Sequence, residues 1–379
     1  MKQLYDTIKT HRRHLHSIPE LGFDLVQTHR YVKDVLKSLG YETHTVASTG
    51  VIAIKRGTSS RTIALRADMD ALNITEQTGV EFASTHEGAM HACGHDGHMA
   101  MLLGFAEYIR NVKTSKTIMF VFEPAEETYG GAREIVESGW FDADTVEAVF
   151  ALHLQPDLDE GKLGINEGIM TAQDGDFDML ITGHNAHGTQ PHLGNDVALA
   201  SSALVMQYHT IIGRSIDPLR PTSINVGTLT LGEGRNIIAQ DAALTGSIRA
   251  FDYETFNHLK ARMRQIDKGI EHAYNVTVNN VITDLHPPVD NDTQLFKQFK
   301  RSLNKDEYAI IAPQMLAEDF SYYQQRVPGL FIMLGSKNIP SGHIHPLHSN
   351  KFNFDESVLL RGLEVYERLL SVFHAYEEE

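Results

Sequence analysis

The chain has 379 residues, of which 42% are hydrophobic and 22% are charged, the balance of an ordinary globular protein rather than a disordered or fibrous one. This length is beyond the size at which one hydrophobic core stops growing, so we expect two domains. The formal net charge of −16 argues against a nucleic-acid partner, because few cations are left to neutralise phosphates.

Apolar, β-rich runs alternate with helical patterns in the first half of the chain. Apolar periodicity predicts helices at residues 4–16, 25–39, 96–110 and 131–138. Short apolar runs predict strands at residues 50–54, 62–65, 117–122 and 146–152. Strands that alternate with helices in this way favour a mostly parallel sheet with helices on both faces.

The pattern changes after about residue 172 and returns near residue 286. Between these points it predicts strand 176–182, helix 196–212, strands 223–231 and 242–251, helix 253–274 and strand 276–283. This β-α-β-β-α-β order is typical of a ferredoxin-like, four-stranded sheet with two helices on one face. A strand at 330–334 and a terminal helix at 355–376 follow. We therefore predict an α/β protein whose catalytic domain, residues 1–172 and 286–379, carries an inserted α+β domain at 173–285.

Polar side chains occur where the strands of the first predicted domain end. They are Asp68 and Asp70 after the second strand, Glu126 and Glu127 after the third, His153 after the fourth, and the segment HIHPLHS, which ends at His348, after the late strand. The carboxyl ends of parallel strands lie at one edge of a sheet, where ligands bind. Any one of these residues alone is better explained as an ordinary loop residue, but four such coincidences predict a common cleft.

The segment MHACGHDGH, residues 90–98, is the densest cluster of metal-binding residue types. Cys93 and His95 lie two residues apart where a helix is expected to begin, and the positive helix end would favour a thiolate. With Glu127, His153 and His348 they form a set of N, O and S ligands that suits Zn²⁺ and also Mn²⁺, Co²⁺ or Ni²⁺. Alone, a cysteine is more often a small buried apolar residue. His98, one turn after His95, either supports this site or lies on the helix surface.

Two adjacent glutamates allow a division of labour. One carboxylate would bind metal, while its unligated neighbour would take a proton from metal-bound water and deliver it to the leaving amine. Asp68 or Asp70 would hold a histidine or a water in the required orientation. Two solvated glutamates at a strand end are the plainer alternative.

Taken together, the motifs of this chain resemble those of the M20 metallopeptidase family. They are RADMDAL, MHACGHDGH, EPAEET followed by GGAREIVESG, ALHLQP, AHGTQPH, GEGRNIIAQDAALTGSIRAFD, AEDFSYY and LHSNKFNFDE. The similarity is to the amidohydrolase branch, which includes hippurate hydrolases, N-acetyl-diaminopimelate deacetylases and plant auxin-conjugate hydrolases. It extends over nearly the whole chain, and the motifs stand in the order that the family shows.

The resemblance implies a catalytic assignment. It implies that two divalent metal ions are bound by Cys93, His95, Glu127, His153 and His348. It also implies that metal-bound water attacks the amide of an N-acyl-L-amino acid, with Glu126 as general acid and base. The last motif departs from many bacterial members, which have two consecutive histidines and a proline, because this chain has His348-Ser349-Asn350. We keep His348 as the ligand and rank His345 and His343 behind it.

The resemblance extends to the inserted domain, which matches the family's lid. His187 resembles the lid histidine that stabilises the oxyanion, in some relatives across a dimer interface. The sequence leaves the oligomeric state open, although a free edge strand on the inserted sheet would offer a contact for a homodimer. Asn236 and Arg249 resemble residues that bind the substrate carboxylate, a task that suits the planar guanidinium group. From the residues alone, an exposed histidine, a turn asparagine and a solvated arginine are the ordinary alternatives.

Three other functions compete with a deacylase. A dipeptidase or carboxypeptidase of the same family differs only in the substrate that it accepts. A cysteine hydrolase would use Cys93 as nucleophile with His95 or His153 as base, and would resist chelators. A catalytically silent binding protein would have no need of a free base, so the presence of both Glu126 and Glu127 argues against it.

The sequence also bears on the compartment. The N-terminal residues contain no apolar run like that of a signal peptide, and no segment approaches the ~20 apolar residues that span a bilayer. Cys93 is the only cysteine, so an internal disulfide is impossible. We expect a cytoplasmic enzyme that acts on a small molecule, with no membrane partner.

Overall fold

The computed structural model describes residues 2–128 and 130–377. The chain divides into two compact units. The first comprises the chain up to Met170, the segment Val289–Ala312 and the chain from Asp319 onward, and the second comprises Thr171–Pro288 and Pro313–Glu318. The short segment 313–318 belongs to the second unit through backbone pairing, in which the amide of Ala172 donates to the carbonyl of Leu316 at 2.9 Å.

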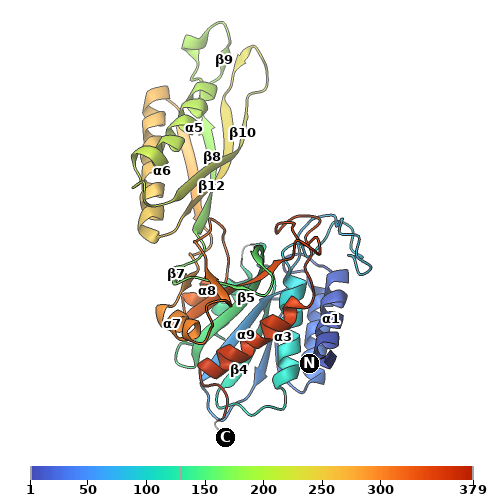
Figure 1. Ribbon diagram of the computed structural model, residues 1–379. Helices are drawn as coiled ribbons and strands as arrows, with labels where there is room; N and C mark the ends of the chain where they lie inside the picture. The colour runs from blue at the N-terminus through green and yellow to red at the C-terminus, as the bar shows by residue number, and fades with distance from the viewer. Residues whose placement is uncertain (1, 129, 378–379) are drawn as a thin grey trace. The chain divides into compact units, whose positions relative to one another are not determined.

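The first unit is built, in its described part, on an eight-stranded sheet (Figure 1). In spatial order the strands are β1 (Glu42–Val46), β2 (Gly50–Lys55), β4 (Thr117–Glu123), β3 (Thr62–Asp68), β5 (Val146–Asp159), β16 (Gly329–Lys337), β6 (Leu163–Ile165) and β15 (Tyr308–Ile310). The four central strands, β4, β3, β5 and β16, run parallel, whereas β1, β2 and β6 pair antiparallel with their neighbours toward the centre. The predicted mostly parallel sheet is thus confirmed, with antiparallel strands toward its edges.

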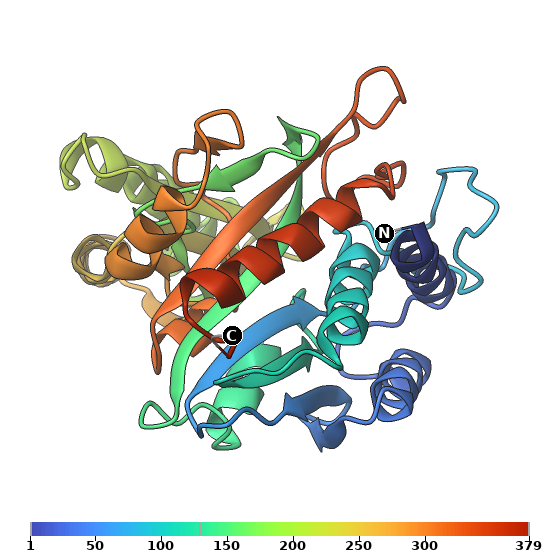
Figure 2. The ribbon, with the colours of Figure 1, turned by 60° about the horizontal axis from the view of Figure 1, so that its bottom comes forward.

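Helices cover both faces of this sheet (Figure 2). One face packs against α1 (Lys2–Ser17), α2 (Val26–Ser38), α3 (His95–Ile109), α7 (Thr293–Arg301) and α9 (Val358–Val372), and the other against α4 (Gly131–Glu137) and α8 (Ser321–Gln324). Successive residues of β3 alternate between the two cores, with Leu65 in one and Ala64 in the other. The central strands are mostly apolar because both of their faces are buried.

The second unit contains a four-stranded antiparallel sheet in the order β10-β12-β8-β13. In chain order its main elements are β8 (Gln173–Thr182), α5 (Val197–Arg214), β10 (Thr222–Leu231), β12 (Asp241–Ala250), α6 (Tyr253–Tyr274) and β13 (Thr277–Asp284). Both helices pack on one face, around Phe177, Leu204 and Leu259. The helix α6 matches its predicted bounds, because the Asp252 side chain caps its first turn and Asn275 ends it in a left-handed conformation.

The elements that the sequence did not reveal are short, apart from β1 and the helix α7. They include β7 (Gly168–Ile169), β14 (Asp290–Asn291), β9 (Ala186–His187), β11 (Ile237–Ile238) and the 3₁₀ turn Pro191–Leu193, all too brief to show a periodicity. The terminal helix is also shorter than the predicted 355–376. It ends because His374 has a φ of 52° and Tyr376 then forms a β-bridge with Thr114.

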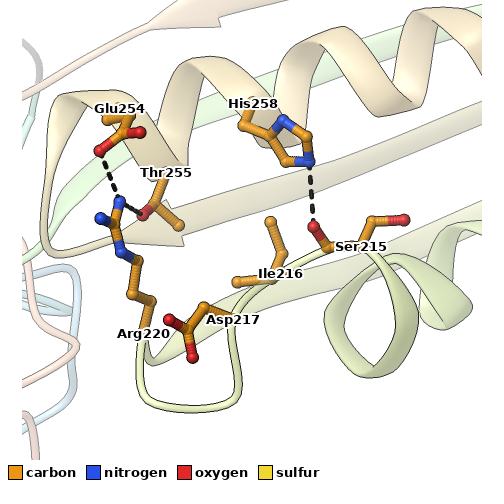
Figure 3. A pocket seen from close by; sticks show the side chains of 7 residues that line it. All are labelled: Ser215, Ile216, Asp217, Arg220, Glu254, Thr255 and His258. Carbon is orange, nitrogen blue, oxygen red and sulfur yellow. Dashed lines mark hydrogen bonds and ion pairs between the residues drawn. The ribbon is translucent and has the colours of Figure 1, made fainter.

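The surface of the second unit holds a pocket of about 300 Å³ between the loop after α5 and the first turns of α6 (Figure 3). Its polar groups bond mainly to one another. Arg220 donates to Glu254 at 2.7 Å, and Nε2 of His258 lies 3.0 Å from the carbonyl of Ser215. The pocket contains none of the predicted site residues. Among the helices of the described residues, none is both long and apolar enough to cross a membrane.

Candidate active site

The five predicted metal ligands converge within the first unit. Cys93 and His95 lie at the start of α3, Glu127 follows β4, His153 lies in β5, and His348 follows β16. Cys93, His95 and Glu127 each offer a ligand atom within 4.8 Å of the other two. The Sγ atom of Cys93 lies 3.5 Å from Nε2 of His153, and Nε2 of His348 lies 3.4 Å from Oε1 of Glu127. His348 is 54% exposed, whereas the other four are largely buried.

Two of these imidazole rings form hydrogen bonds with backbone carbonyls. These bonds determine which ring nitrogen faces the cluster. Nδ1 of His95 donates to the carbonyl of Asp70 at 2.9 Å, and Nδ1 of His153 donates to the carbonyl of Leu154 at 2.8 Å. When the rings are neutral, these bonds leave an unprotonated Nε2 facing the cluster, as a metal ligand requires. Within the described residues, Nε2 of His95 and Oε1 of Glu127 are buried and accept no hydrogen bond. Two buried polar atoms without a hydrogen-bond partner fit a bound cation.

The electrostatics of the cluster favour positive charge. Burial lowers the pKa of His95, but Asp68, Asp70 and Glu127 outweigh burial and raise it to about 10. Burial raises the pKa of the Cys93 thiol well above its usual value, and Glu127 and Glu126 reinforce the rise. The prediction that the helix end favours a thiolate is therefore wrong for the protein without a cation, because burial and nearby carboxylates outweigh the helix dipole. A bound cation would reverse this balance.

The side chain of Asp70 forms hydrogen bonds with the backbone of the two glutamates. Its carboxylate accepts the backbone N–H of Glu126 and that of Glu127, each at 3.0 Å, while its own carbonyl accepts from His95. The carboxylate of Glu126 comes within 4.0 Å of Nε2 of His95. Asp70 thus contacts one histidine through its backbone carbonyl and the backbone of both glutamates through its side-chain carboxylate.

Asp68 makes different contacts. Its Oδ1 lies 2.6 Å from Nδ1 of His98, and its Oδ2 accepts from Arg66 at 2.6 Å. Of the two alternatives for His98, the helix-surface position is wrong, because the residue is fully buried. Both aspartates therefore contact groups at or near the cluster, and which of them orients a metal ligand stays a prediction.

Sequence reasoning missed a set of buried charges around these residues. Arg66 donates to Glu123 at 3.0 and 2.8 Å and to Asp319 at 2.9 Å, and all three side chains are buried. Asp96, which follows His95, accepts from Arg12 at 2.9 Å. A signal was present for Arg66, since an arginine inside the otherwise apolar strand TIALRAD requires partners. Two of its partners, Glu123 and Asp319, are distant in sequence and could not be inferred.

The three predicted residues of the inserted domain occupy two places in the second unit. His187 lies in β9, which pairs with β11. Asn236 directly precedes β11, and its carbonyl accepts from the amide of Gly188 at 2.8 Å. Arg249 lies near the far end of β12, eight residues beyond Asp241, or roughly 26 Å along a strand. Its guanidinium group donates to the carbonyl of Met315. The structure therefore brings His187 and Asn236 together but does not bring Arg249 to them.

Histidines, a cysteine and two adjacent glutamates lie together at the carboxyl ends of parallel strands. The chain is therefore an α/β protein with a polar ligand site at this edge of its sheet. Residues 64–372 match the model of peptidase family M20/M25/M40. The chain belongs to this family, as the sequence motifs predicted, and is a hydrolase.

Known proteins resemble the chain over most of its length. It is 34% identical to an uncharacterized hydrolase of Staphylococcus aureus (strain bovine RF122 / ET3-1) over 96% of this chain and 97% of that protein. It is 38% identical to an N-acetyldiaminopimelate deacetylase of Listeria monocytogenes, with 86% and 89% covered. A Bacillus subtilis structure, described as a dinuclear metal-binding peptidase from family M20, superposes with a TM-score of 0.86 at 29% identity, covering 99% of both chains.

Proposed function

We propose that this protein hydrolyses the amide bond of N-acyl-L-amino acids in a metal-dependent reaction and releases the acyl group from the amino acid. The observation that carries the proposal is the cluster of Cys93, His95 and Glu127, in which buried acceptor atoms lack donors among the described residues. The similarity to an N-acetyldiaminopimelate deacetylase supports an acetylated amino acid as substrate. In this proposal the first unit is the catalytic domain and the second is a lid and dimerisation domain.

Two divalent ions would be held by Cys93, His95, Glu127, His153 and His348. The similarity to a dinuclear metal-binding peptidase supports a pair of ions, and the mixed N, O and S donors suit Zn, Mn, Co or Ni. When bound, such ions supply a Lewis acid for the amide carbonyl and lower the pKa of water. The Nδ1 bonds of His95 and His153 to backbone carbonyls hold the two rings in the orientation that this requires.

Glu126 would move the protons of the reaction. Asp70 fixes the backbone of Glu126, and this bond helps to hold the carboxylate of Glu126 in position beside His95. Its oxygen would take a proton from the attacking water and then deliver that proton to the nitrogen of the departing amine. Asp68 and Asp70 would not exchange protons with substrate but would keep the surrounding groups in place.

The predicted roles of the second unit stay proposals. Nδ1 of His187 contacts Thr189, whose backbone N–H lies at 3.2 Å and whose Oγ1 lies at 2.8 Å, so Nε2 is left to face an oxyanion. Asn236 and Arg249 would bind the substrate carboxylate. The bond from Arg249 to Met315 supports the competing view that this arginine is structural. A homodimer through this unit belongs to the same proposal.

A second candidate is a dipeptidase or carboxypeptidase, which the similarity to a peptidase of family M20 favours. The chemistry would be the same, and only the acyl side of the substrate would differ. A cysteine hydrolase is less well supported, because the raised pKa of Cys93 is the reverse of what a nucleophilic thiol needs.

A substrate screen tests the proposal. The protein would be stripped with EDTA, reconstituted separately with Zn²⁺, Mn²⁺, Co²⁺ or Ni²⁺, and assayed against N-acetyl amino acids, N-benzoyl amino acids and dipeptides, including N-acetyl-L,L-diaminopimelate. We expect activity on an N-acyl amino acid that EDTA abolishes and metal restores. Activity that survives EDTA would contradict metal dependence, and turnover of dipeptides alone would favour the second candidate.

A further inference from the structure

We propose that His98 is a positioning residue for the reaction, which orients His153 through the backbone of Leu154 without itself binding metal. The inference rests on the proposed function, in which His153 is a metal ligand. The sequence alone did not decide whether His98 supports the site or lies on the helix surface. The inference depends on a continuous series of hydrogen bonds within the first unit.

The series begins with a backbone group that the sheet leaves unpaired. Strand β3 pairs with β5 only as far as Arg66 opposite Ala151, whereas β5 continues to Asp159 beside β16. Leu154 therefore lies beyond the end of the pairing on the β3 side, and it is fully buried. A buried N–H requires an acceptor. Nε2 of His98 provides it at 2.9 Å, so an imidazole replaces the carbonyl that a longer strand would have supplied.

The other nitrogen of His98 fixes the ring. Nδ1 lies 2.6 Å from Oδ1 of Asp68, to which it must donate, since Nε2 already accepts. Arg66 in turn donates to the other oxygen of Asp68. His98 lies in one group with Asp68, His95 and His153, whose ligand atoms are all within 4.8 Å. Because both of its nitrogens are engaged, however, His98 has no lone pair left for a metal ion.

The series ends at His153. The carbonyl of Leu154 accepts from Nδ1 of His153, which leaves Nε2 of that ring facing Cys93 at 3.5 Å. The rings of His98 and His153 are also in contact, with centroids 4.6 Å apart. Losing the bond that the N–H of Leu154 donates to His98 would free the Leu154 backbone to turn, and the carbonyl that orients His153 would turn with it.

Two amide substitutions separate the bonds of His98. In His98→Gln the amide reaches the position of Nε2 and retains an acceptor for the N–H of Leu154. In His98→Asn the shorter amide reaches only the position of Nδ1, so it keeps the bond to Asp68 and loses the one to Leu154. His91→Asn is the matched control, because His91 is buried in the same segment and neither of its ring nitrogens has a hydrogen-bond partner among the described residues.

The probe is Co²⁺, titrated into full-length protein stripped of metal. Calorimetry gives the affinity, and the thiolate-to-cobalt charge-transfer band reports coordination by Cys93 without any substrate. We expect His98→Asn to weaken Co²⁺ binding about 10–100-fold, the usual effect of losing a group that orients a ligand. His98→Gln should stay close to wild type, as should His91→Asn. Thermal unfolding in EDTA shows whether each variant is folded.

The outcomes distinguish this inference from the proposed function. If the wild-type protein gives no thiolate band, the proposed metal site fails and this inference fails with it. If the wild-type protein binds Co²⁺ and both His98 variants bind it equally well, only the inference fails. Equal weakening by His98→Asn and His91→Asn would also overturn it, because the effect would then follow from loss of any buried histidine in the segment. If His98→Asn does not fold, retained binding in His98→Gln supports the inference and lost binding opposes it.

Discussion

Ala125, the residue before the two site glutamates, has a left-handed backbone. It is fully buried and has a φ of 60°, a conformation that costs a non-glycine residue about 1–3 kcal/mol. The bonds from Glu126 and Glu127 to Asp70 hold the chain in this conformation. His348, at the other side of the cluster, also has a positive φ, of 62°. The cluster is thus flanked by backbone that the surrounding contacts keep in an unfavourable geometry, as is common at functional sites.

Glu126→Gln tests the proposed proton transfer at this scale. The amide keeps the size of the side chain but accepts no proton, so turnover should fall about 10²–10⁴-fold while metal content stays at the wild-type level. Steady-state kinetics and elemental analysis of the same sample measure both quantities. Near-normal turnover in the metal-loaded variant would remove Glu126 from the mechanism.

At the scale of elements, the turn between β4 and α4 allows no side chain where α4 begins. A Cβ atom on Gly131 would lie 1.7 Å from the carbonyl oxygen of Pro124, which is a backbone atom and cannot move aside cheaply. The turn between these two residues carries Glu126 and Glu127. By contrast, a Cβ on Gly269, in the middle of α6, would meet nothing within 4 Å. The turn therefore requires glycine at position 131, whereas the space around Gly269 would accommodate a side chain.

Alanine substitutions should separate these two cases. Gly131→Ala should destabilise the protein by at least about 1–3 kcal/mol, because the backbone must shift to avoid the clash. Gly269→Ala should stabilise α6 by about 1 kcal/mol, because alanine loses less conformational entropy in a helix than glycine does. Urea unfolding followed by circular dichroism compares them with wild type. A Gly131→Ala protein as stable as the wild type would show that the turn is less constrained than its geometry indicates.

At the scale of the molecule, buried ion pairs in the first unit join segments that are far apart in sequence. Asp96 of α3 accepts from Arg12 and His16 of α1, and the other nitrogen of His16 lies 3.2 Å from Glu76, in the irregular segment that follows β3. Burial raises the pKa of Glu76, but bonds from His16, Ser84 and Thr78 outweigh burial and lower it to about 2. This network is sensitive to acid as a result.

The decrease in the free energy of unfolding at acidic pH should depend on Glu76. In the folded protein the pKa of Glu76 lies below its usual value of 4.5, so the contribution of Glu76 to stability is present above pH 4.5 and is lost as the pH falls toward 2. Glu76→Gln should therefore lower stability at neutral pH and flatten the decline between pH 4.5 and 2. Urea unfolding in EDTA, which keeps metal release from contributing, measures this decline. Glu87→Gln, an exposed position in the same segment, is the control and should follow the wild-type curve.

The sequence by itself determined the long elements and the membership of the family. Apolar periodicity gave the central strands and α6 because each repeats a local pattern over many residues, and the bounds of α6 matched because caps are local signals. The five predicted ligands came from motifs, and the structure brings them together because parallel strands end at a common edge. Their roles stay predictions until the variants are measured.

Only the tertiary structure decided which atom of each residue faces which partner. The Nε2 atoms of His95 and His153 point into the cluster because Asp70 and Leu154 supply carbonyls to the opposite nitrogens. The burial of His98, the partners of Arg66 and the raised pKa of Cys93 likewise depend on groups that lie far apart in the chain. Periodicity and motifs report what is near in sequence, whereas hydrogen bonding and desolvation depend on what is near in space.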